Sequence, residues 1–221
     1  MRSRSLIVGG VLGAALALAP PARADLTLGF GGISANSVVD TAIGEAQLQV
    51  TVSAAGANQV LFRFDNLGPL ASSITDVYFD DGSLLGIASL IDADDGVGGN
   101  AGVDFSQGAA NPGDLPSGNN ASPPFTVTAG FLADSDAPPP ANGVNPGEWL
   151  GIIFNLQDFQ TLANTEAALF DGSLRIGIHV QGFDGGGSEA FVNTPPVPAP
   201  GAVLLGALGL GLVGWVRKRV K

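Results

Sequence analysis

The sequence predicts an all-β protein: an antiparallel β-sandwich, jelly-roll-like, with one short helix, flanked by an N-terminal signal helix and a C-terminal transmembrane helix. Three observations support this prediction. Apolar and polar residues alternate in several short runs, which clusters of Gly, Pro, Asn and Asp separate. Both ends of the 221-residue chain are basic and apolar, whereas all 20 acidic residues lie between them. The chain has no Cys, which excludes a disulfide framework, a thiolate zinc site and a cysteine nucleophile.

The first half of the chain contains four predicted strands. Residues 47–53 and 60–65 alternate between apolar and polar side chains, as half-buried strands do. Residues 75–80 also alternate, and Tyr78 falls on their polar face, where it is expected to be exposed beside carboxylates. Residues 83–91 are more uniformly apolar. We expect these segments to form part of two packed sheets.

The second half contains three further predicted strands and the one predicted helix. Residues 125–131 follow two prolines, residues 149–156 are apolar on both faces, as in a central strand, and residues 174–181 alternate clearly. Apolar residues recur at helical spacing over 159–170, with Asp158 as the expected N-cap and Asp171-Gly172 ending the run. Two long segments rich in Gly, Pro, Asn and Asp are predicted to be loops: 96–124 and 133–147.

Charge separates the middle of the chain from its ends. Residues 25–194 contain two basic residues, Arg63 and Arg175, against 20 acidic ones, which gives this segment a formal charge of −18. A nucleic-acid partner is excluded, because binding phosphates requires a basic face. The segment is long enough to bury a core of its own, and we expect residues 25–194 to form one acidic β-domain.

The first 24 residues are predicted to be a secretory signal peptide. Two Arg residues precede an uncharged apolar run over 6–18, and the small residues Ala22 and Ala24 follow it. This order of basic, apolar and small residues is typical of a segment that signal peptidase removes. Cleavage is expected before Asp25, so residues 1–24 play no part in the predicted fold.

The last segment, 195–221, is predicted to hold a membrane helix. Residues 201–216 are uncharged and rich in Gly and Leu, and the basic residues Arg217, Lys218 and Arg219 follow directly. A basic cluster beside an apolar helix stays on the cytoplasmic side of the inner membrane. Residues 25–194 would then lie outside, as the signal peptide also predicts.

The tail resembles a known sorting signal. The motif Val197-Pro198-Ala199-Pro200, the apolar helix and the terminal basic cluster are together similar to the PEP-CTERM signal of Gram-negative bacteria, although Ala199 stands where the usual motif has Glu. The resemblance implies processing by a membrane exosortase near the Pro motif and display at the cell surface or in the extracellular matrix. It also implies an association with exopolysaccharide and biofilm. The alternative is an ordinary single-pass anchor.

An acidic, Gly-rich loop offers oxygen ligands for a metal. The candidate ligands are Asp92, Asp94, Asp95 and Asp104. Carboxylate oxygens suit Ca²⁺, and extracellular calcium concentrations can fill weak sites. The spacing is not that of an EF-hand, and the alternative is a solvated acidic loop that keeps an exported protein soluble.

Few residues support catalysis. The single His, His179, falls on the polar face of its strand, where a solvated surface position is expected, and no Gly-x-Ser-x-Gly motif accompanies it. Glu148, beside Trp149, is the best candidate acid for glycoside hydrolysis, because an apolar neighbour can raise a carboxyl pKa. Trp149 and Tyr78 are the two candidate aromatic platforms for a sugar.

These observations predict a non-enzymatic, exported protein of the cell surface or extracellular matrix, held transiently at the membrane by its tail. The first alternative is a calcium-assisted carbohydrate-binding or adhesion module. The second is a glycoside hydrolase. Calcium is the one cofactor considered.

Overall fold

The computed structural model describes residues 25–81, 84–91, 102–108, 113–128 and 132–195. The predicted signal peptide, with Ala22 and Ala24, lies outside these residues. So do three of the candidate calcium ligands, Asp92, Asp94 and Asp95, and the whole sorting motif and membrane helix after residue 195.

Ten antiparallel strands form one sheet, in the order β5-β8-β3-β2-β1-β10-β9-β4-β7-β6. The strands are β1 (Leu26–Gly32), β2 (Leu48–Gly56), β3 (Gln59–Asn66), β4 (Ser73–Asp80), β5 (Leu85–Ile91), β6 (Phe105–Gln107), β7 (Leu132–Ser135), β8 (Trp149–Leu156), β9 (Arg175–Gln181) and β10 (Glu189–Asn193). The prediction of an all-β, antiparallel body is confirmed. The order also places β8 between two neighbours, as its apolar faces predicted.

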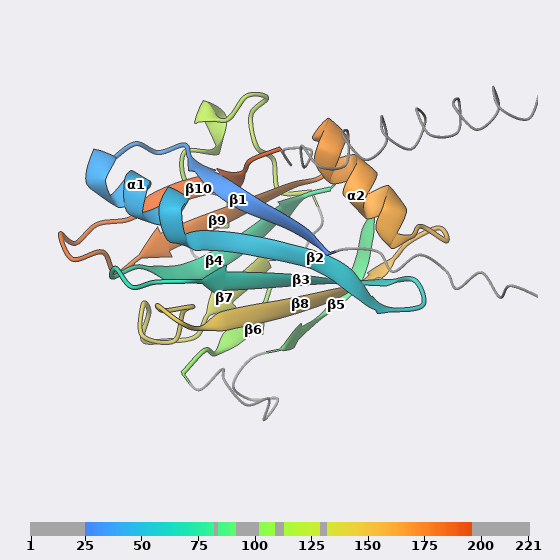
Figure 1. Ribbon diagram of the computed structural model, residues 1–221, viewed down its shortest axis with the longest axis horizontal. Helices are drawn as coiled ribbons and strands as arrows, with labels where there is room; N and C mark the ends of the chain where they lie inside the picture. Colours follow the sequence, from blue (N-terminus) through green and yellow to red (C-terminus); the bar gives the residue numbers. More distant parts are fainter. Residues whose placement is uncertain (1–24, 82–83, 92–101, 109–112, 129–131, 196–221) are drawn as a thin grey trace, which may run out of the picture.

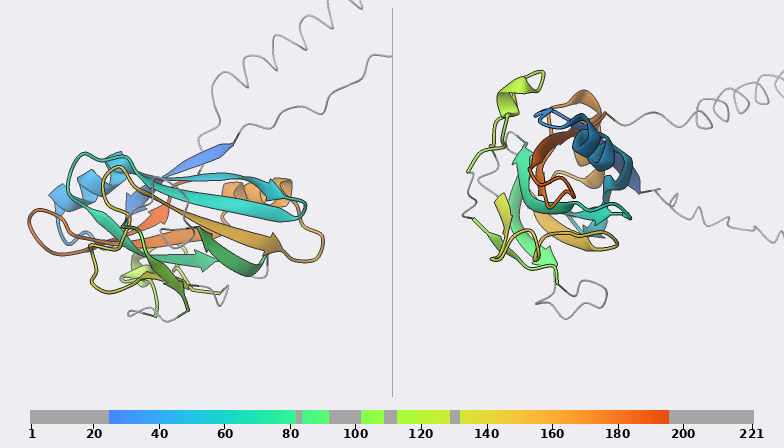
Figure 2. Two further views of the ribbon diagram at one scale, coloured as in Figure 1. Left: turned by 90° about the horizontal axis from the view of Figure 1, so that it is seen from below. Right: turned by 90° about the vertical axis from the view of Figure 1, so that its left-hand side faces the viewer.

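Strand β1 joins two halves of this sheet. Its first residues pair with β2, as in Leu28↔Val50, and its last residues pair with β10, as in Phe30↔Asn193. We call β5, β8, β3 and β2 half A, and β10, β9, β4, β7 and β6 half B. The sheet curls so that the halves face each other around a common interior, which is visible end on in Figure 2.

The interior is a single apolar core to which both halves contribute. Phe62 of β3 and Phe154 of β8 come from half A, and Phe79 of β4 comes from half B; all three are fully buried. The Phe79 ring lies edge-to-face against both others, with centroid distances of 5.2 Å to Phe62 and 4.9 Å to Phe154. Each such pair contributes about 0.5–1.5 kcal/mol beyond area burial. The aromatic cluster therefore holds the two halves together.

Two helices pack at opposite ends of the curled sheet (Figure 1). Helix α1 (Val38–Gln47) contacts β1 and β10, and helix α2 (Leu162–Asp171) contacts β2 and β3. The prediction of only one helix is wrong, because α1 was missed. Its β-branched residues disfavour a helix locally, but the Oγ of Ser37 caps its N-terminus by accepting a hydrogen bond from the Asp40 N–H.

Close packing fixes α1 against the sheet. A Cβ atom on Gly44 would lie 2.2 Å from the Phe191 ring of β10, a distance that no side chain tolerates. The helix can therefore approach the core only because Gly stands at this position. Its apolar residues Val38 and Val39 instead point outward, at 85% and 68% exposure.

Helix α2 was predicted with the wrong start. Asp158 is not the N-cap: Thr161 is, and its N–H and Oγ both donate to Oδ1 of Asn164. Asp158 and Phe159 have left-handed backbone angles, which prevent the helix from starting there. The predicted stop is confirmed, since Gly172 ends the helix at φ 80°.

One predicted strand is absent from the described residues. Residues 125–128 cross the outer face of half B without joining the sheet, while 129–131 lie outside the described part. The predicted loops 96–124 and 133–147 contain the short strand β6, a 3-10 turn (Gly118–Asn120) and most of β7. Neither helix in the described part of the chain has the length and hydrophobicity needed to cross a bilayer.

Candidate functional site: a buried acidic row on half B

The outer face of half B is covered by the segment 113–128, which we call the cover. Its apolar residues Leu115 and Phe125 pack on Tyr78 of β4, and together with Leu132 and Ala190 these form a second, smaller core. Gly177 of β9 lies directly beneath. A Cβ atom there would be 2.7 Å from Leu115 and 3.1 Å from Phe125, so the glycine makes room for the cover.

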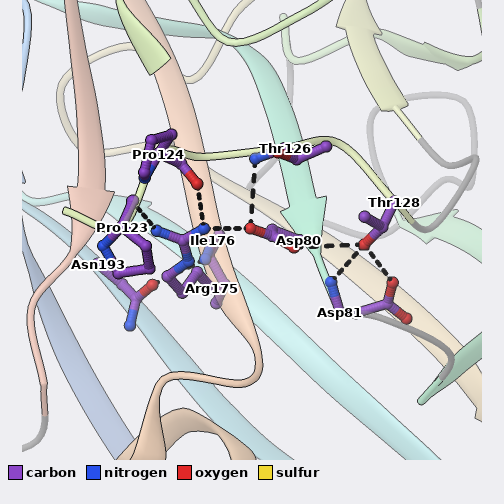
Figure 3. A network of polar contacts seen from close by, with 9 residues as sticks. All are labelled: Asp80, Asp81, Pro123, Pro124, Thr126, Thr128, Arg175, Ile176 and Asn193. Atoms are coloured by element: carbon purple, nitrogen blue, oxygen red, sulfur yellow. Dashed lines mark hydrogen bonds and ion pairs between the residues drawn. The ribbon is translucent and has the colours of Figure 1, made fainter. Parts of the chain in front are cut away.

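Arg175 fastens the cover to the sheet, as Figure 3 shows. Its guanidinium donates to Oδ2 of Asp80 on the neighbouring strand and to the carbonyl oxygens of Pro123 and Pro124 in the cover, the last at 2.7 Å. It also lies 5.4 Å from the ring centroid of Phe125. With 13% of its side chain exposed, Arg175 forms a shielded ion pair that joins two strands and the cover.

A second set of contacts fastens the end of the cover. The Asp81 N–H donates to Oγ1 of Thr128 at 2.8 Å, and the Thr128 hydroxyl lies 3.2 Å from Oδ1 of Asp81. The Thr126 N–H donates to Asp80 at 3.3 Å. These bonds explain why residues 125–128 do not form a strand: their polar groups bind the end of β4 instead of a ladder.

On the same face as Tyr78, three titratable residues stand side by side across three strands. Asp76 of β4 is opposite Asp134 of β7 on one side and His179 of β9 on the other. Asp76 is 2% exposed and His179 is 7% exposed. We call Asp134, Asp76 and His179 the acidic row. Ser106 of β6 continues it next to Asp134, and Ala190 of β10 ends it next to His179.

The two oxygens of Asp76 differ in their contacts. Oδ2 lies 2.9 Å from Nδ1 of His179 and accepts a hydrogen bond of 2.8 Å from the Thr75 hydroxyl. Oδ1 is buried and has no hydrogen-bond donor among the described residues. Asp134 is the cross-strand neighbour of Asp76, and a carboxyl group can donate to another only while it carries a proton.

Burial and charge repulsion alter the acid–base chemistry of this site. Desolvation, followed by the charge of Asp76, a hydrogen bond to Asp76 and the charge of Asp136, raises the pKa of Asp134 to about 6. Burial is also the main cause that raises the pKa of Tyr78 above its usual range, with further contributions from Asp76, Asp134 and Asp114. At neutral pH the Tyr78 phenol is therefore uncharged, while Asp134 titrates around pH 6, in the mildly acidic range.

Two predictions about this face are wrong. Tyr78 and His179 do lie on the polar face of their strands, but both are buried, and Leu115 and Phe125 of the cover pack on Tyr78. His179 was expected to be solvated and Tyr78 to be available to a sugar. In the structure His179 instead bonds the buried carboxylate of Asp76.

The fourth candidate calcium ligand, Asp104, lies just before β6 at the edge of half B. Its backbone N–H donates to Asn142, and its carbonyl accepts from Asp136, both at 2.9 Å. The described residues contain no cluster of three or more acidic or His side chains arranged to hold a metal ion. The other three predicted ligands, Asp92, Asp94 and Asp95, lie outside the described residues, so the calcium site stays a prediction.

The candidate hydrolytic acid has a local structural role. Oε2 of Glu148 accepts from the Asn145 backbone N–H at 2.8 Å and from its side-chain amide at 3.0 Å, which closes the turn before β8. Trp149 lies on the outer face of half A, where the Arg63 guanidinium sits 4.6 Å from its ring centroid.

Comparison with known proteins adds no relative: no family, curated protein or solved structure matches the chain. The acidic row was not foreseen as a group, since Asp76 and Asp134 meet only through long-range strand pairing. The alternation of residues 75–80 placed Asp76 correctly on its face, but no local signal marked Asp134 as its neighbour.

Proposed function

We propose that the protein is an exported, non-enzymatic component of the cell surface or extracellular matrix, which signal peptidase and an exosortase process. The observation that carries the proposal is the arrangement of the body between the two predicted membrane-directed segments. All 20 acidic residues belong to residues 25–194, and this stretch is where the described fold lies.

The two ends of the described body lie close together, which suits a protein handled at a membrane through both ends. Strands β1 and β10 are neighbours, and the Thr194 N–H donates to the Gly29 carbonyl at 2.9 Å. Figure 2 shows both ends on the same side of the body. A leader before Asp25 and a tail after Pro195 would therefore join the domain at one place.

The charge of the body favours a place outside the membrane. Its two basic residues are both engaged with carboxylates, Arg63 with Asp65 at 2.9 Å and Arg175 with Asp80. A surface of this kind is repelled by anionic lipids and by strongly anionic polymers. If exopolysaccharide is the partner, these charges favour a neutral or weakly charged polymer.

The arrangement of the strands is also part of this proposal. We interpret the two facing halves as a jelly-roll-like β-sandwich, in which the continuous strand β1 joins the sheets at one side. The chain repeatedly crosses between the halves, as in the steps from β3 to β4 and from β4 to β5. Scaffolds of this type commonly present binding surfaces rather than deep catalytic clefts.

The acidic row supports a non-enzymatic function. A general base must reach the proton that it abstracts, whereas His179 and Asp76 are buried and bond each other. Their neighbours Thr75 and Gln181 also bond within the same network. These contacts favour a structural role for the single His.

The test is to express the full chain and a variant lacking residues 195–221 in the native host. The full chain is expected at the cell surface or in the medium, without Met1 and without Lys221 by mass spectrometry. The truncated chain should still lose its leader, but it should neither be held at the membrane by a tail nor be processed by exosortase. As a matched control, Arg63→Gln removes one basic residue from the body and should leave sorting unchanged. Full-length protein in the cytosol, with both ends intact, would contradict the proposal.

The second candidate function is carbohydrate binding, with or without calcium, and the outer face of half A favours it. This face carries Trp149 beside the exposed Arg63, and Gln49 and Thr51 lie on the neighbouring strand in register with Asp65 and Arg63. Planar and polar side chains in adjacent rows are suited to sugar rings. A glycan array with and without Ca²⁺ tests this candidate, and Trp149→Ala should abolish any binding found.

A further inference from the structure

Strand β7 is held to the sheet by a short ladder. Only three residue pairs join it to β4: Asp76↔Asp134, Val77↔Ala133 and Tyr78↔Leu132. Strand β6 is attached to β7 by three pairs as well. The paired strands β6 and β7 at the end of half B are therefore joined to β4 by a short ladder, and one of its three pairs brings two carboxyl groups together.

We propose that Asp76 and Asp134 share one proton, and that the resulting carboxyl–carboxylate hydrogen bond is a pH-sensitive clasp that holds β7 on β4. In the closed state, protonated Asp134 donates to the Asp76 carboxylate, which provides the donor that the buried Oδ1 of Asp76 lacks. Loss of the proton to solvent leaves two negative charges side by side in a partly buried place. The ladder between β4 and β7 is then weakened.

The other charged and titratable groups around the pair favour this division of roles. From β9, His179 bonds Oδ2 of Asp76, which keeps Asp76 as the acceptor. From β4, the Tyr78 phenol is uncharged at neutral pH. Asp136, after β7, and Asp114, in the cover, add negative charge on the Asp134 side. Ser106 of β6, opposite Asp134, does not titrate and donates to Asp136.

The direction of the pH effect follows from the acid–base chemistry. The pKa of Asp134 is about 6 in the folded protein against an ordinary value of 3.8, so the folded state holds the proton more tightly than the unfolded chain. Stability therefore falls as pH rises from about 4 through about 6, and it stays lower above that range. This is opposite to the usual behaviour of a salt-bridged Asp, which stabilises a protein as pH rises.

The test compares melting temperatures of the full chain, purified in mild detergent, between pH 5 and pH 8. The wild type should melt about 2–6 °C lower at pH 8 through this pair. Asp134→Asn supplies a permanent donor to Asp76 and removes one charge, so its melting temperature should exceed that of the wild type at pH 8 and change less with pH. Asp184→Asn, the same chemical change at an exposed turn residue, should keep the wild-type profile.

A second measurement needs no variant. Infrared difference spectra of the wild type should show a protonated carboxyl group at pH 5 that is lost by pH 8, a range in which ordinary Asp side chains are ionised. Absence of such a group would overturn the proposal, as would an Asp134→Asn profile parallel to that of the wild type. Addition of CaCl₂ at pH 8 tests whether a cation, rather than a proton, joins the two carboxylates. A calcium-dependent rise in the melting temperature that Asp134→Asn abolishes would also overturn the proposal of a shared proton.

Discussion

The outer faces of halves A and B are built from the same alternating pattern but meet different surroundings. On half A the polar row is open: Arg63 has 45% of its side chain exposed and pairs with Asp65 above Trp149. On half B the corresponding Arg175 has 13% exposed and is enclosed between β4 and the cover. Alternation therefore determines which residues share a face, whereas a distant segment decides whether that face meets water.

The largest effect is expected where the two halves share their core. Phe79→Ala removes the ring that contacts both Phe62 and Phe154 and should lower the free energy of unfolding by about 3–5 kcal/mol. Urea denaturation measures the loss. Phe159→Ala, at a ring that is 91% exposed, is the matched control and should change stability by less than about 0.5 kcal/mol. Equal losses from both variants would contradict a common core.

The two arginines give the sharpest comparison between the faces. Arg175→Ala leaves Asp80 without its cation and removes two bonds that hold the cover, so a loss of about 2–4 kcal/mol is expected. Arg63→Ala breaks an exposed ion pair and should cost about 0–1 kcal/mol. Urea denaturation and limited proteolysis at residues 113–128 report the two effects. If the two variants lose similar stability, the cover does not enclose Arg175.

A smaller effect is expected from two glycines, one on each face. Gly177→Ala would place a Cβ 2.7 Å from Leu115 and should destabilise the protein by about 1–3 kcal/mol by lifting the cover. Gly151→Ala on half A meets Ile91 and Leu61 at 3.1–3.3 Å. Those side chains lie on a partly open face, and the change should stay within about 1 kcal/mol. Thermal melting distinguishes them, and an unaffected Gly177→Ala would mean that the cover shifts freely.

The strands that were predicted best are those in which apolar and polar residues alternate, because this alternation alone shows which face is buried. Residues 47–53, 60–65 and 174–181 became β2, β3 and β9, because one face of each meets the common core. Helix α1 was missed since its β-branched residues gave no helical apolar stripe, and its position depends on Gly44 meeting Phe191, a long-range contact.

The acidic row shows where prediction from the sequence stops. The face of Asp76 and His179 could be derived from local spacing, but their burial could not, and the burial of Tyr78 on the same face involves Leu115 and Phe125 in the cover. Phe125 itself was assigned to a strand because the apolar residues around it are typical of one. The bonds from Arg175 to Pro123 and Pro124, which hold this segment outside the sheet, could not be predicted from the local sequence. Pairing of Asp134 with Asp76 likewise requires the strand order.

The adjacency of β1 and β10 makes the body suited to circular permutation. Since Thr194 bonds Gly29, a linker of a few residues, spanning about 10–15 Å, would join the end of β10 to the start of β1. New termini could open in the exposed turn between β2 and β3, around Ala57 and Asn58, where no ladder would be cut. Such a rearranged chain would begin and end at the β2–β3 turn instead of beside the β1–β10 pair.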